Sequence, residues 1–457
     1  MKVPRFVLSR RMRARLRAQR RWWRARLRGH ARGEVLFPPA GRGMVAVETL
    51  AGPPPLPRDA EGAPAPTAQE SVHERGPRIA VLHATAGSGH KRAAEALARA
   101  VATLDPAVTV REVDTLVFAS RWYRGTYAAS YNAMAAHAPQ LWGALYHSWA
   151  AAPVNRSTAP ARLALDRLNL RRLVRVVDRE RPDAIVCTHF LPVEALSPRR
   201  GRGLDAPLYC VITDFAAHPF WAFPHVDRYF VAADAVADEL IRLGVSAERI
   251  EVTGIPVDPR FARSLGREAA RERFGLDPAR PVVLVMGGGH GVGPLGELAE
   301  RMAELRPEAQ VLVVCGTNAR LRDQIDHLPA GRVGRVRTLG FTHDVDALLE
   351  ACDAVVGKAG GLTCSEALVK RAPLIVFRPT PGQEVGNARF LASAGAAVLA
   401  DSAAEVTATL ARWLADPGAS GAVREAQTRL ARPDAAGAIA RRVLADLAER
   451  AGLTHRE

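Results

Sequence analysis

A histidine stands at the start of a helical pattern in the segment GSGHKRAAEAL, where Gly87, Ser88 and Gly89 turn the chain just before His90. Backbone N–H groups at a helix start attract an anion and lower the pKa of a nearby histidine, which favours a neutral base. The third glycine of a dinucleotide fingerprint is missing. The alternative is a histidine that only makes a capping contact.

A second polar group follows the apolar run LYCVIT, in the segment VITDFAAHPFWAF. It contains Asp214 and His218, with Trp221 and Phe223 beside them. A carboxylate at the end of a buried strand can orient a histidine or an acceptor hydroxyl. An aspartate that caps a helix fits the same pattern.

The segment GGGHGVGPLG (287–296) follows another apolar run and holds a literal GxGxxG at Gly291, Gly293 and Gly296. Such a match is weak by itself. It allows a backbone to approach a diphosphate closely. It equally fits a tight turn before a helix with Pro294 at its first position.

The segment GKAGGLTCSEALVKRAPLIVFRPTPGQEVGNARFL (357–391) is the most specific of the four. Gly360 and Gly361 leave room for phosphates, and the hydroxyls of Thr363 and Ser365 can donate hydrogen bonds to them. The amides and dipole of a helix start add attraction. We therefore expect a nucleotide-sugar donor here.

Further polar residues of this segment have two interpretations. Glu366 could bind a ribose diol, but Thr363-x-x-Glu366 also forms a capping box. Gln383, Glu384 and Asn387 follow a Pro-Gly turn, where they could contact sugar hydroxyls or only build the turn.

No metal or disulfide site is expected. Asp344 and Asp346 have the DxD form that holds a metal on some donor diphosphates, but here they open a helix with Thr342 as cap. The cysteines are odd in number, far apart and set mostly in apolar runs, which indicates a reducing compartment. They are Cys187, Cys210, Cys315, Cys352 and Cys364.

Apolar runs alternate with helical patterns from residue 77 onward, which predicts an α/β fold with parallel, doubly wound sheets. The segment VTGIPVDPRF (252–261) interrupts the alternation. We expect two Rossmann-like domains, 77–255 on the acceptor and membrane side and 256–457 on the donor side, with the last helix able to cross back. The active site should lie in the cleft between them.

Residues 1–34 carry 13 Lys and Arg against one acid, so most of the net charge of +16 belongs to this arm. The arm lacks the apolar core of a signal peptide or membrane span. It could be an interfacial helix for anionic lipid, a solvated tail, an arm that sticks to nucleic acid, or an untranslated stretch before Met44. A Pro-rich linker follows, and we expect 1–76 to be disordered.

The segment 120–149 is rich in aromatic residues whose rings suit a membrane interface. They could equally be core residues. They are Tyr123, Tyr127, Tyr131, Trp142, Tyr146 and Trp149.

From Arg78 to Arg450, these segments together resemble the monogalactosyldiacylglycerol synthase and processive diacylglycerol glucosyltransferase family, inverting enzymes of the GT-B fold (glycosyltransferase family 28) related to MurG. The motifs GKAGGLTCSEAL and PGQEVGNA carry the resemblance most specifically. GKAGG replaces the commoner GKPGG, and the first loop lacks a third glycine, but no side chain needed for the chemistry is lost.

The resemblance implies roles for individual residues. His90 is the expected base on the acceptor hydroxyl, and Asp214 is a second expected catalytic residue, from a motif on the acceptor side. The acceptor-binding residues are His218, Trp221, Tyr127 and Tyr131. The donor-binding residues are Gly289, Gly316, Asn318, Phe341, Gly360, Gly361, Thr363, Ser365, Glu366, Gln383, Glu384 and Asn387.

The expected function is transfer of glucose or galactose from a UDP-sugar to diacylglycerol or a similar lipid, giving a β-glycolipid. We expect neither cofactor nor metal, no nucleic-acid partner, and a peripheral position on the inner face of the cell membrane at an anionic surface. Two alternatives remain open: a UDP-sugar epimerase on the same fold, and a non-catalytic protein that binds lipid or nucleotide.

Overall fold

The computed structural model describes residues 76–85, 87–127, 139–150, 162–303, 305, 309–328 and 336–452. These all belong to one compact unit, Arg58–Glu457. The basic arm, nearly all of the Pro-rich linker and Tyr131 lie outside the described residues.

The first sheet is entirely parallel, with the strand order β2-β1-β3-β4-β5-β6. Its order reverses between β1 and β3, and ligands bind beside such reversals in open α/β sheets. The strands are β1 Arg78–His83, β2 Thr109–Asp114, β3 Ala184–Cys187, β4 Leu208–Val211, β5 Arg228–Val231 and β6 Ile250–Val252.

Helices pack against both faces of this sheet because alternate residues of each strand are apolar toward opposite sides. One buried cluster unites Ile79, Val81 and Val186 with α2, and another unites Leu82, Ile185 and other strand residues with the helices of the opposite face. The helices are α2 Ser88–Leu104, α4 Pro139–Ala150, α6 Arg171–Glu180, α7 Phe190–Arg200 and α8 Asp234–Arg242. Residues 121–127 and 162–169 are also helical.

The second sheet is also parallel, with the order β12-β11-β10-β7-β8-β9 and a reversal between β7 and β10. Both faces are again covered, so the strands are apolar throughout. The strands are β7 Val282–Met286, β8 Gln310–Gly316, β9 Val336–Gly340, β10 Ala354–Gly357, β11 Leu374–Phe377 and β12 Ala397–Ala400. The helices are α9 Arg267–Arg273, α10 Leu295–Ala303, α11 Ala319–Asp326, α13 Val345–Ala351, α14 Gly361–Lys370, α15 Gln383–Ser393, α16 Ala403–Ala415 and α17 Gly421–Leu430.

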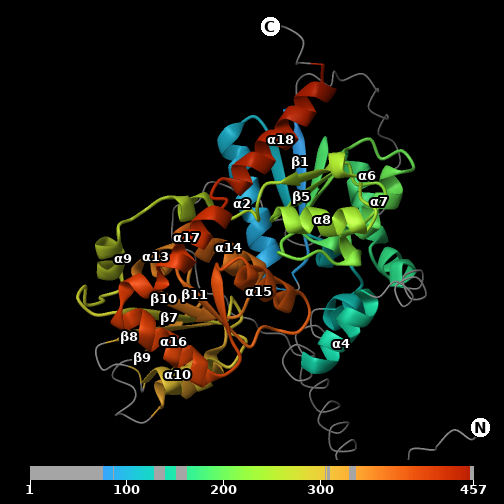
Figure 1. Ribbon diagram of the computed structural model, residues 1–457. Coiled ribbons are helices and arrows are strands. Elements are labelled where there is room, and N and C mark those ends of the chain that lie inside the picture. Colours follow the sequence, from blue (N-terminus) through green and yellow to red (C-terminus); the bar gives the residue numbers. More distant parts are fainter. Residues whose placement is uncertain are drawn as a thin grey trace, which may run out of the picture. The chain divides into compact units, whose positions relative to one another are not determined.

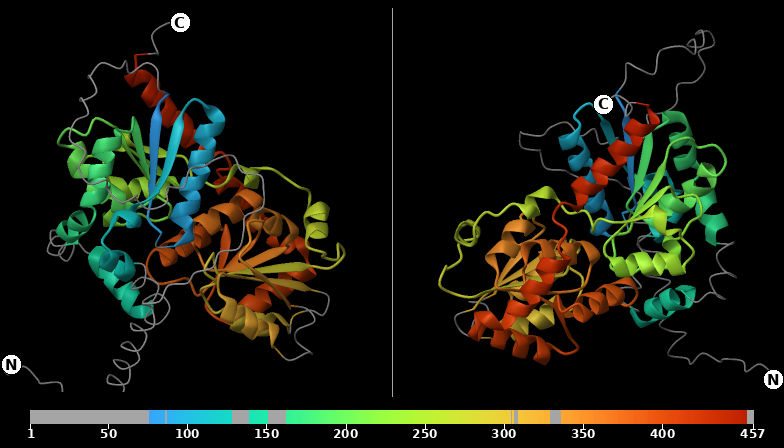
Figure 2. Two further views of the ribbon diagram at one scale, coloured as in Figure 1. Left: turned by 180° about the vertical axis from the view of Figure 1, so that it is seen from behind. Right: turned by 45° about the horizontal axis from the view of Figure 1, so that its top comes forward.

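The last helix, α18 (Ala435–Arg450), follows the second sheet in sequence but packs beside α2 on the first sheet (Figures 1 and 2). Ala436, Ile439, Ala440 and Val443 are at most 2% exposed there. The two sheet domains are therefore joined twice, by the chain near residue 255 and by the approach to α18.

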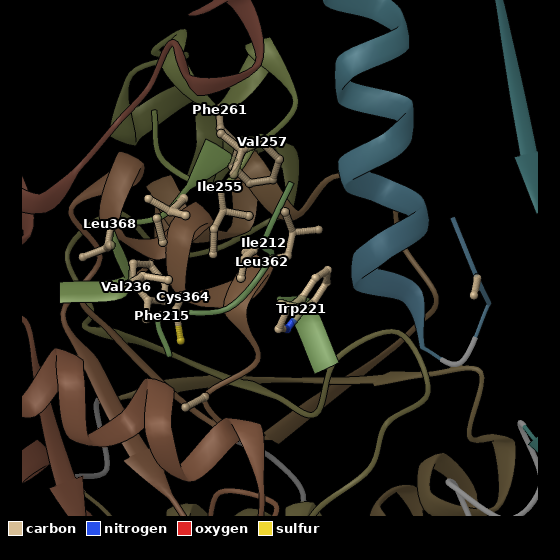
Figure 3. Packing of buried hydrophobic residues seen from close by; sticks show 14 of the residues in the cluster. Ile212, Phe215, Trp221, Val236, Ile255, Val257, Phe261, Leu362, Cys364 and Leu368 are labelled. Atoms are coloured by element: carbon tan, nitrogen blue, oxygen red, sulfur yellow. The ribbon is translucent and has the colours of Figure 1, made fainter. Parts of the chain in front are cut away.

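A continuous apolar cluster also joins the two sheet domains (Figure 3). Leu362, Cys364 and Leu368 of α14 pack with residues that follow β4, including Phe215, whose ring stacks on Phe390 of α15 at 5.3 Å between centroids. This packing fixes α14 against the carboxyl end of the first sheet.

The prediction of two parallel, doubly wound sheets is confirmed, and the differences are local. Residues 184–190 form one apolar run in the sequence, but the strand ends at Cys187 and α7 begins at Phe190. β6 was not predicted, because its three half-buried residues leave no apolar run. α14 begins at Gly361 with Gly360 as N-cap, so Thr363 does not cap it. No described helix is both long and apolar enough to cross a membrane.

Candidate functional site

A cavity of about 510 Å³ lies where the carboxyl ends of the strands of both sheets meet. Its walls are the segments after β1, β3 and β4 of the first sheet and after β7, β9 and β10 of the second. Both sheets thus contribute at the positions where parallel sheets bind ligands.

His90, in the first turn of α2, lines this cavity. Its Nδ1 lies 2.8 Å from the carbonyl oxygen of Thr188, which can only accept, so Nδ1 carries the proton and donates. The Thr213 hydroxyl oxygen lies 2.9 Å from the same nitrogen. Burial lowers the pKa of His90 to about 4, against a smaller opposite effect of the Thr188 carbonyl. His90 is therefore a neutral imidazole with an unprotonated Nε2.

Asp214 also lines the cavity, but its described partner is not His90. Its Oδ1 accepts a hydrogen bond of 2.9 Å from Asn387 Nδ2. Burial raises the pKa of Asp214 to about 6, partly offset by that hydrogen bond. A backbone carbonyl, that of Thr188, fixes the His90 ring.

Asn387 holds the two sheet domains together instead of facing the cavity. Its Nδ2 also donates to the Ala359 carbonyl at 3.0 Å, and its Oδ1 accepts from the Phe215 amide at 2.7 Å. The side chain is fully buried. All of its donors are used in this arrangement, so a sugar hydroxyl finds no donor on Asn387 here.

Glycine-rich backbone forms the cavity wall on the second sheet. Gly288 and Gly289 follow β7, and Gly360 and Gly361 precede α14. Gly288 has φ +71°, a conformation that other residues rarely adopt. The α14 start presents unsatisfied amides and the positive end of a helix dipole, which favour a phosphate.

A lysine stands among these loops. Lys358 lines the cavity, and its Nζ lies 2.6 Å from Oε1 of Glu384. The other oxygen of Glu384 accepts from the Thr380 amide at 2.8 Å. Lys358 belongs to the GKAGG motif, but the sequence argument considered the glycines of this motif and not its lysine.

Glu366 is buried behind the cavity rather than in its wall. Its Oε1 lies 2.7 Å from Nη2 of Arg92, which comes from α2 of the first domain and lines the cavity. Oε2 is buried and has no hydrogen-bond partner among the described residues. Burial raises the pKa of Glu366 to about 7, although Arg92 opposes the shift.

Aromatic and charged residues line the first-domain end of the cavity. Trp221, Phe190 and Phe220 pack against one another, and the Arg162 guanidinium lies 4.3 Å above the Phe220 ring. Arg162 also contacts buried Glu194 at 2.6 Å. Arg162 lies 3.6 Å from Asp166 as well, so these residues make a largely apolar surface with one charged cluster.

His218 anchors the aromatic helix α4 to this end. Its Nδ1 accepts from the Phe220 amide at 3.2 Å, so Nε2 donates to the Tyr146 carbonyl at 3.1 Å. The Tyr146 and His218 ring centroids are 4.2 Å apart. His218 thus positions α4 at the cavity.

The structure brings most of the predicted site residues to one cavity. Those that line it are His90, Asp214, His218, Trp221, Tyr127, Gly289, Gly316, Phe341, Gly360, Gly361, Thr363, Gln383 and Glu384.

Four other residues predicted to bind the donor do not line the cavity. Glu366 and Asn387 are engaged as described above. Asn318 caps α11 by accepting from Leu321, and the Ser365 hydroxyl donates back to the Gly361 carbonyl.

The glycines of the literal GxGxxG pattern do not line the cavity either. Gly291, Gly293 and Gly296 do not line the cavity, whereas the preceding Gly287–Gly289 do. A Cβ at Gly291 would lie 2.0 Å from the Cys315 carbonyl oxygen, so this glycine serves the turn.

The acidic pair of the DxD pattern is occupied by arginines. Asp344 contacts Arg273 at 2.6 Å, and Asp346 lies 3.7 Å from Arg260. Within the described ranges, no group of three or more His, Cys, Asp or Glu residues has the geometry of a metal site.

Sequence reasoning missed further cavity-lining residues that can take part in chemistry, which are Arg92, Arg162, Asp166, His189, His290 and Lys358. His189 lies within the apolar run 184–190, which hides it. The arginines lie on helices, where only the packing of the chain decides which side chains face the site.

Comparisons with known proteins agree with this geometry. Residues 90–257 match the family model of monogalactosyldiacylglycerol (MGDG) synthase, and residues 282–431 match the glycosyltransferase family 28 C-terminal domain. A processive diacylglycerol beta-glucosyltransferase of Bacillus cereus is 33% identical over 278 residues, which are 60% of this chain and 71% of the relative. The chain belongs to this glycosyltransferase family.

Two further comparisons limit the conclusions that family membership allows. The processive diacylglycerol beta-glucosyltransferase of Bacillus licheniformis is 34% identical over 247 residues, covering 54% of this chain and only 64% of the relative. MurG of Acinetobacter baumannii aligns over 81% of this chain and 99% of its own, with a TM-score of 0.51 and 15% identity. The MurG likeness shows the fold alone, and the expected GT-B fold of this family is confirmed.

Glu366→Gln should change how stability depends on pH. Because the folded pKa of Glu366 is about 7 against an ordinary 4.5, its contribution to stability is complete below pH 4.5 and is lost as the pH rises through 7. Glutamine does not titrate. The free energy of unfolding of the variant relative to wild type should therefore rise from pH 4.5 to 7, by at most about 3 kcal/mol.

Urea unfolding at several pH values measures this difference. Glu425→Gln, which changes an exposed glutamate on α17, is the matched control and should not reproduce the change expected for Glu366→Gln. Parallel profiles for wild type and Glu366→Gln would contradict the assignment.

Proposed function

We propose that the chain is an inverting glycosyltransferase that moves glucose or galactose from a UDP-sugar to the hydroxyl of diacylglycerol or a similar lipid, forming a β-glycolipid. One observation carries the proposal: the same cavity is lined by His90, whose Nε2 is unprotonated, and by the glycine-rich loop at the start of α14. A base and a phosphate-binding backbone in one cavity are what a displacement at the anomeric carbon requires.

The donor lies on the wall of the second domain. Its diphosphate meets the amides at Gly360 and Gly361 and the loop at Gly288 and Gly289, where no side chain obstructs the backbone. Gln383 and Glu384, at the start of α15, reach the hexose. Neither side chain distinguishes glucose from galactose by its type alone.

The acceptor oxygen attacks the anomeric carbon while its proton passes to Nε2 of His90. The bond from that carbon to the UDP oxygen breaks on the opposite face, so the configuration inverts. The negative diphosphate raises the pKa of the nearby imidazole when it binds, which makes His90 a better proton acceptor than in the empty cavity.

The leaving diphosphate gains negative charge, and this chain stabilises it without a bound metal in our proposal. Helix-start amides supply fixed dipoles, and the cations Lys358 and Arg92 line the same cavity. Asp344 and Asp346 are held by arginines and are not assigned a metal.

A lipid acceptor is favoured by the apolar rim of the cavity. Trp122 and Leu165 line the cavity and remain 66% and 46% exposed. Exposed apolar side chains around a cavity mouth indicate contact with a lipid surface or another apolar partner. We propose that this rim rests on a membrane with anionic lipid on its inner, cytoplasmic face, where diacylglycerol enters the cavity.

The direct test is transfer of labelled hexose. Purified full-length chain is incubated with labelled UDP-glucose or UDP-galactose and vesicles of phosphatidylglycerol containing diacylglycerol, with and without EDTA. We expect a labelled β-glycolipid on thin-layer separation, at an EDTA-independent rate. Loss of activity with EDTA and its return with Mn²⁺ would contradict the metal-free mechanism.

The same assay without lipid separates the alternatives. An epimerase converts the UDP-sugar alone, whereas a transferase needs the acceptor. A non-catalytic binding protein yields no product in either reaction. Conversion of the sugar nucleotide without lipid would overturn the proposed function.

His90→Ala should lower kcat by at least about a hundredfold, because general-base catalysis contributes roughly that much. UDP affinity should change by less than about twofold, since the donor loops are untouched. Calorimetry measures UDP binding and the labelled assay measures kcat. His327→Ala, which removes an exposed histidine on the far end of α11, is the control; undiminished turnover of His90→Ala would refute the base assignment.

Replacing the rim residues Trp122 and Leu165 together with serine should weaken vesicle binding. Each change removes exposed apolar surface that our proposal places in lipid. We expect the sedimented fraction to fall severalfold on phosphatidylglycerol vesicles, with UDP affinity retained. The control is Leu243→Ser, which changes an exposed apolar residue after α8 that does not line the cavity; an equal loss in both variants would contradict the rim assignment.

A further inference from the structure

A second histidine lies beside His90 in the cavity wall. His189 follows β3 and directly precedes α7, is 2% exposed, and lines the cavity. The His189 and His90 ring centroids are 4.5 Å apart, and their planes meet at 73°. The His90 base and the donor loops do not account for this buried polar side chain.

The hydrogen bonds of His189 fix its tautomer. The Leu191 amide donates to Nδ1 of His189 at 3.0 Å and so caps the start of α7. A backbone amide can only donate, so Nδ1 is unprotonated and Nε2 carries the hydrogen. Burial, and then the neighbouring His90, lower the pKa of His189, which keeps the ring neutral.

His90 has the opposite tautomer, because its Nδ1 donates to the Thr188 carbonyl. In the described part of the chain, neither Nε2 has a protein hydrogen-bond partner. The two rings therefore offer one acceptor and one donor, side by side in one wall of the cavity. An alcohol is the simplest group that satisfies both, since it has one proton and two lone pairs.

We propose that His189 orients the acceptor alcohol: its Nε2–H donates to the hydroxyl oxygen whose proton His90 takes through Nε2. This inference rests on the proposed function and adds a residue to it. One lone pair of the oxygen accepts from His189, and the other forms the bond to the anomeric carbon. The bond from that carbon to UDP breaks, its electron pair leaves with UDP, and the proton ends on His90.

The spacing suits one shared oxygen. The two rings meet edge to face with centroids 4.5 Å apart, so one small group bound against them can contact both. A neutral donor also leaves the oxygen more nucleophilic than a charged one would, because hydrogen bonds from neutral groups are weaker. The hydrogen bond from His189 orients the hydroxyl oxygen through one lone pair and leaves the other lone pair free to attack.

His189→Asn is the test variant. Asparagine is a good N-cap and retains an acceptor for the Leu191 amide, but it places no donor where the imidazole Nε2 lies. With UDP present, calorimetry should show that dioctanoylglycerol binds about tenfold more weakly, as expected for one lost hydrogen bond. UDP affinity should stay within about twofold of wild type. Ser402→Ala, which removes the N-cap of α16 away from the cavity, is the control for loss of a helix cap and should bind both ligands like wild type.

A thiol analogue of the acceptor separates orientation from a structural effect. Sulfur is a weak hydrogen-bond acceptor, so the thiol gains little from His189 in wild type. We expect the affinities of wild type and His189→Asn for dioctanoylthioglycerol to differ by less than about threefold. The same loss for alcohol and thiol, or no loss for either, would overturn the inference.

Turnover distinguishes this inference from the proposed function. If wild type transfers hexose and His189→Asn loses about tenfold or more in kcat/KM for the alcohol but not the thiol, both stand. If wild type transfers no hexose, the proposed function fails, while the binding comparison of alcohol and thiol still decides the role of His189. If wild type binds no dioctanoylglycerol, the inference fails.

Discussion

The site depends on the close approach of two backbones, that of Gly361 at the start of α14 and that of Thr213 after β4. A Cβ at Gly361 would lie 2.0 Å from the Thr213 carbonyl oxygen, so any larger residue would force the two domains apart. The Thr213 hydroxyl also contacts Nδ1 of His90. The phosphate-facing helix start and the proposed base are therefore fixed by the same contact. Asn387 reinforces it by hydrogen bonding Asp214 and Phe215 of the first domain from α15 of the second.

The fold could be predicted because each buried parallel strand leaves a long apolar run, and such runs recur with helices between them. Short elements could not be predicted, because they leave no long apolar run. β6 is only three half-buried residues, and its pattern merges with the proline-rich connection after it. The boundary between β3 and α7 is not visible in the sequence, because His189 and Phe190 extend the apolar run. The helix start depends on a histidine side chain acting as cap. That the last helix could cross back was anticipated, but the faces of α18 and α2 that pack together are set by tertiary contacts that no local pattern encodes.

The parts of the candidate site that bind through the backbone were predicted well. The parts that depend on the direction of a side chain were predicted less well. Glycine loops after strands are visible in sequence because only their residue type matters. Residues on helices are different, because a shift of one or two positions along a helix moves a side chain from the face toward the cavity to the face toward the core. Glu366 and Asn387 lie in the predicted motifs, yet one turns to Arg92 and the other to the first domain. Both directions are set by the neighbouring domain, which the motif does not describe.

Charge explains how a mostly apolar cavity can accept a diphosphate. Three cations line it in the described chain, and each is already near a carboxylate: Arg92 with Glu366, Arg162 with Glu194, and Lys358 with Glu384. An unpaired cation in such a place would carry a large desolvation cost, which these pairs remove. A bound diphosphate must then compete with the carboxylates. That competition is least costly at Glu366, because its pKa of about 7 lets it take up a proton when Arg92 turns to the phosphates, and at Glu384, because the Thr380 amide still satisfies one of its oxygens.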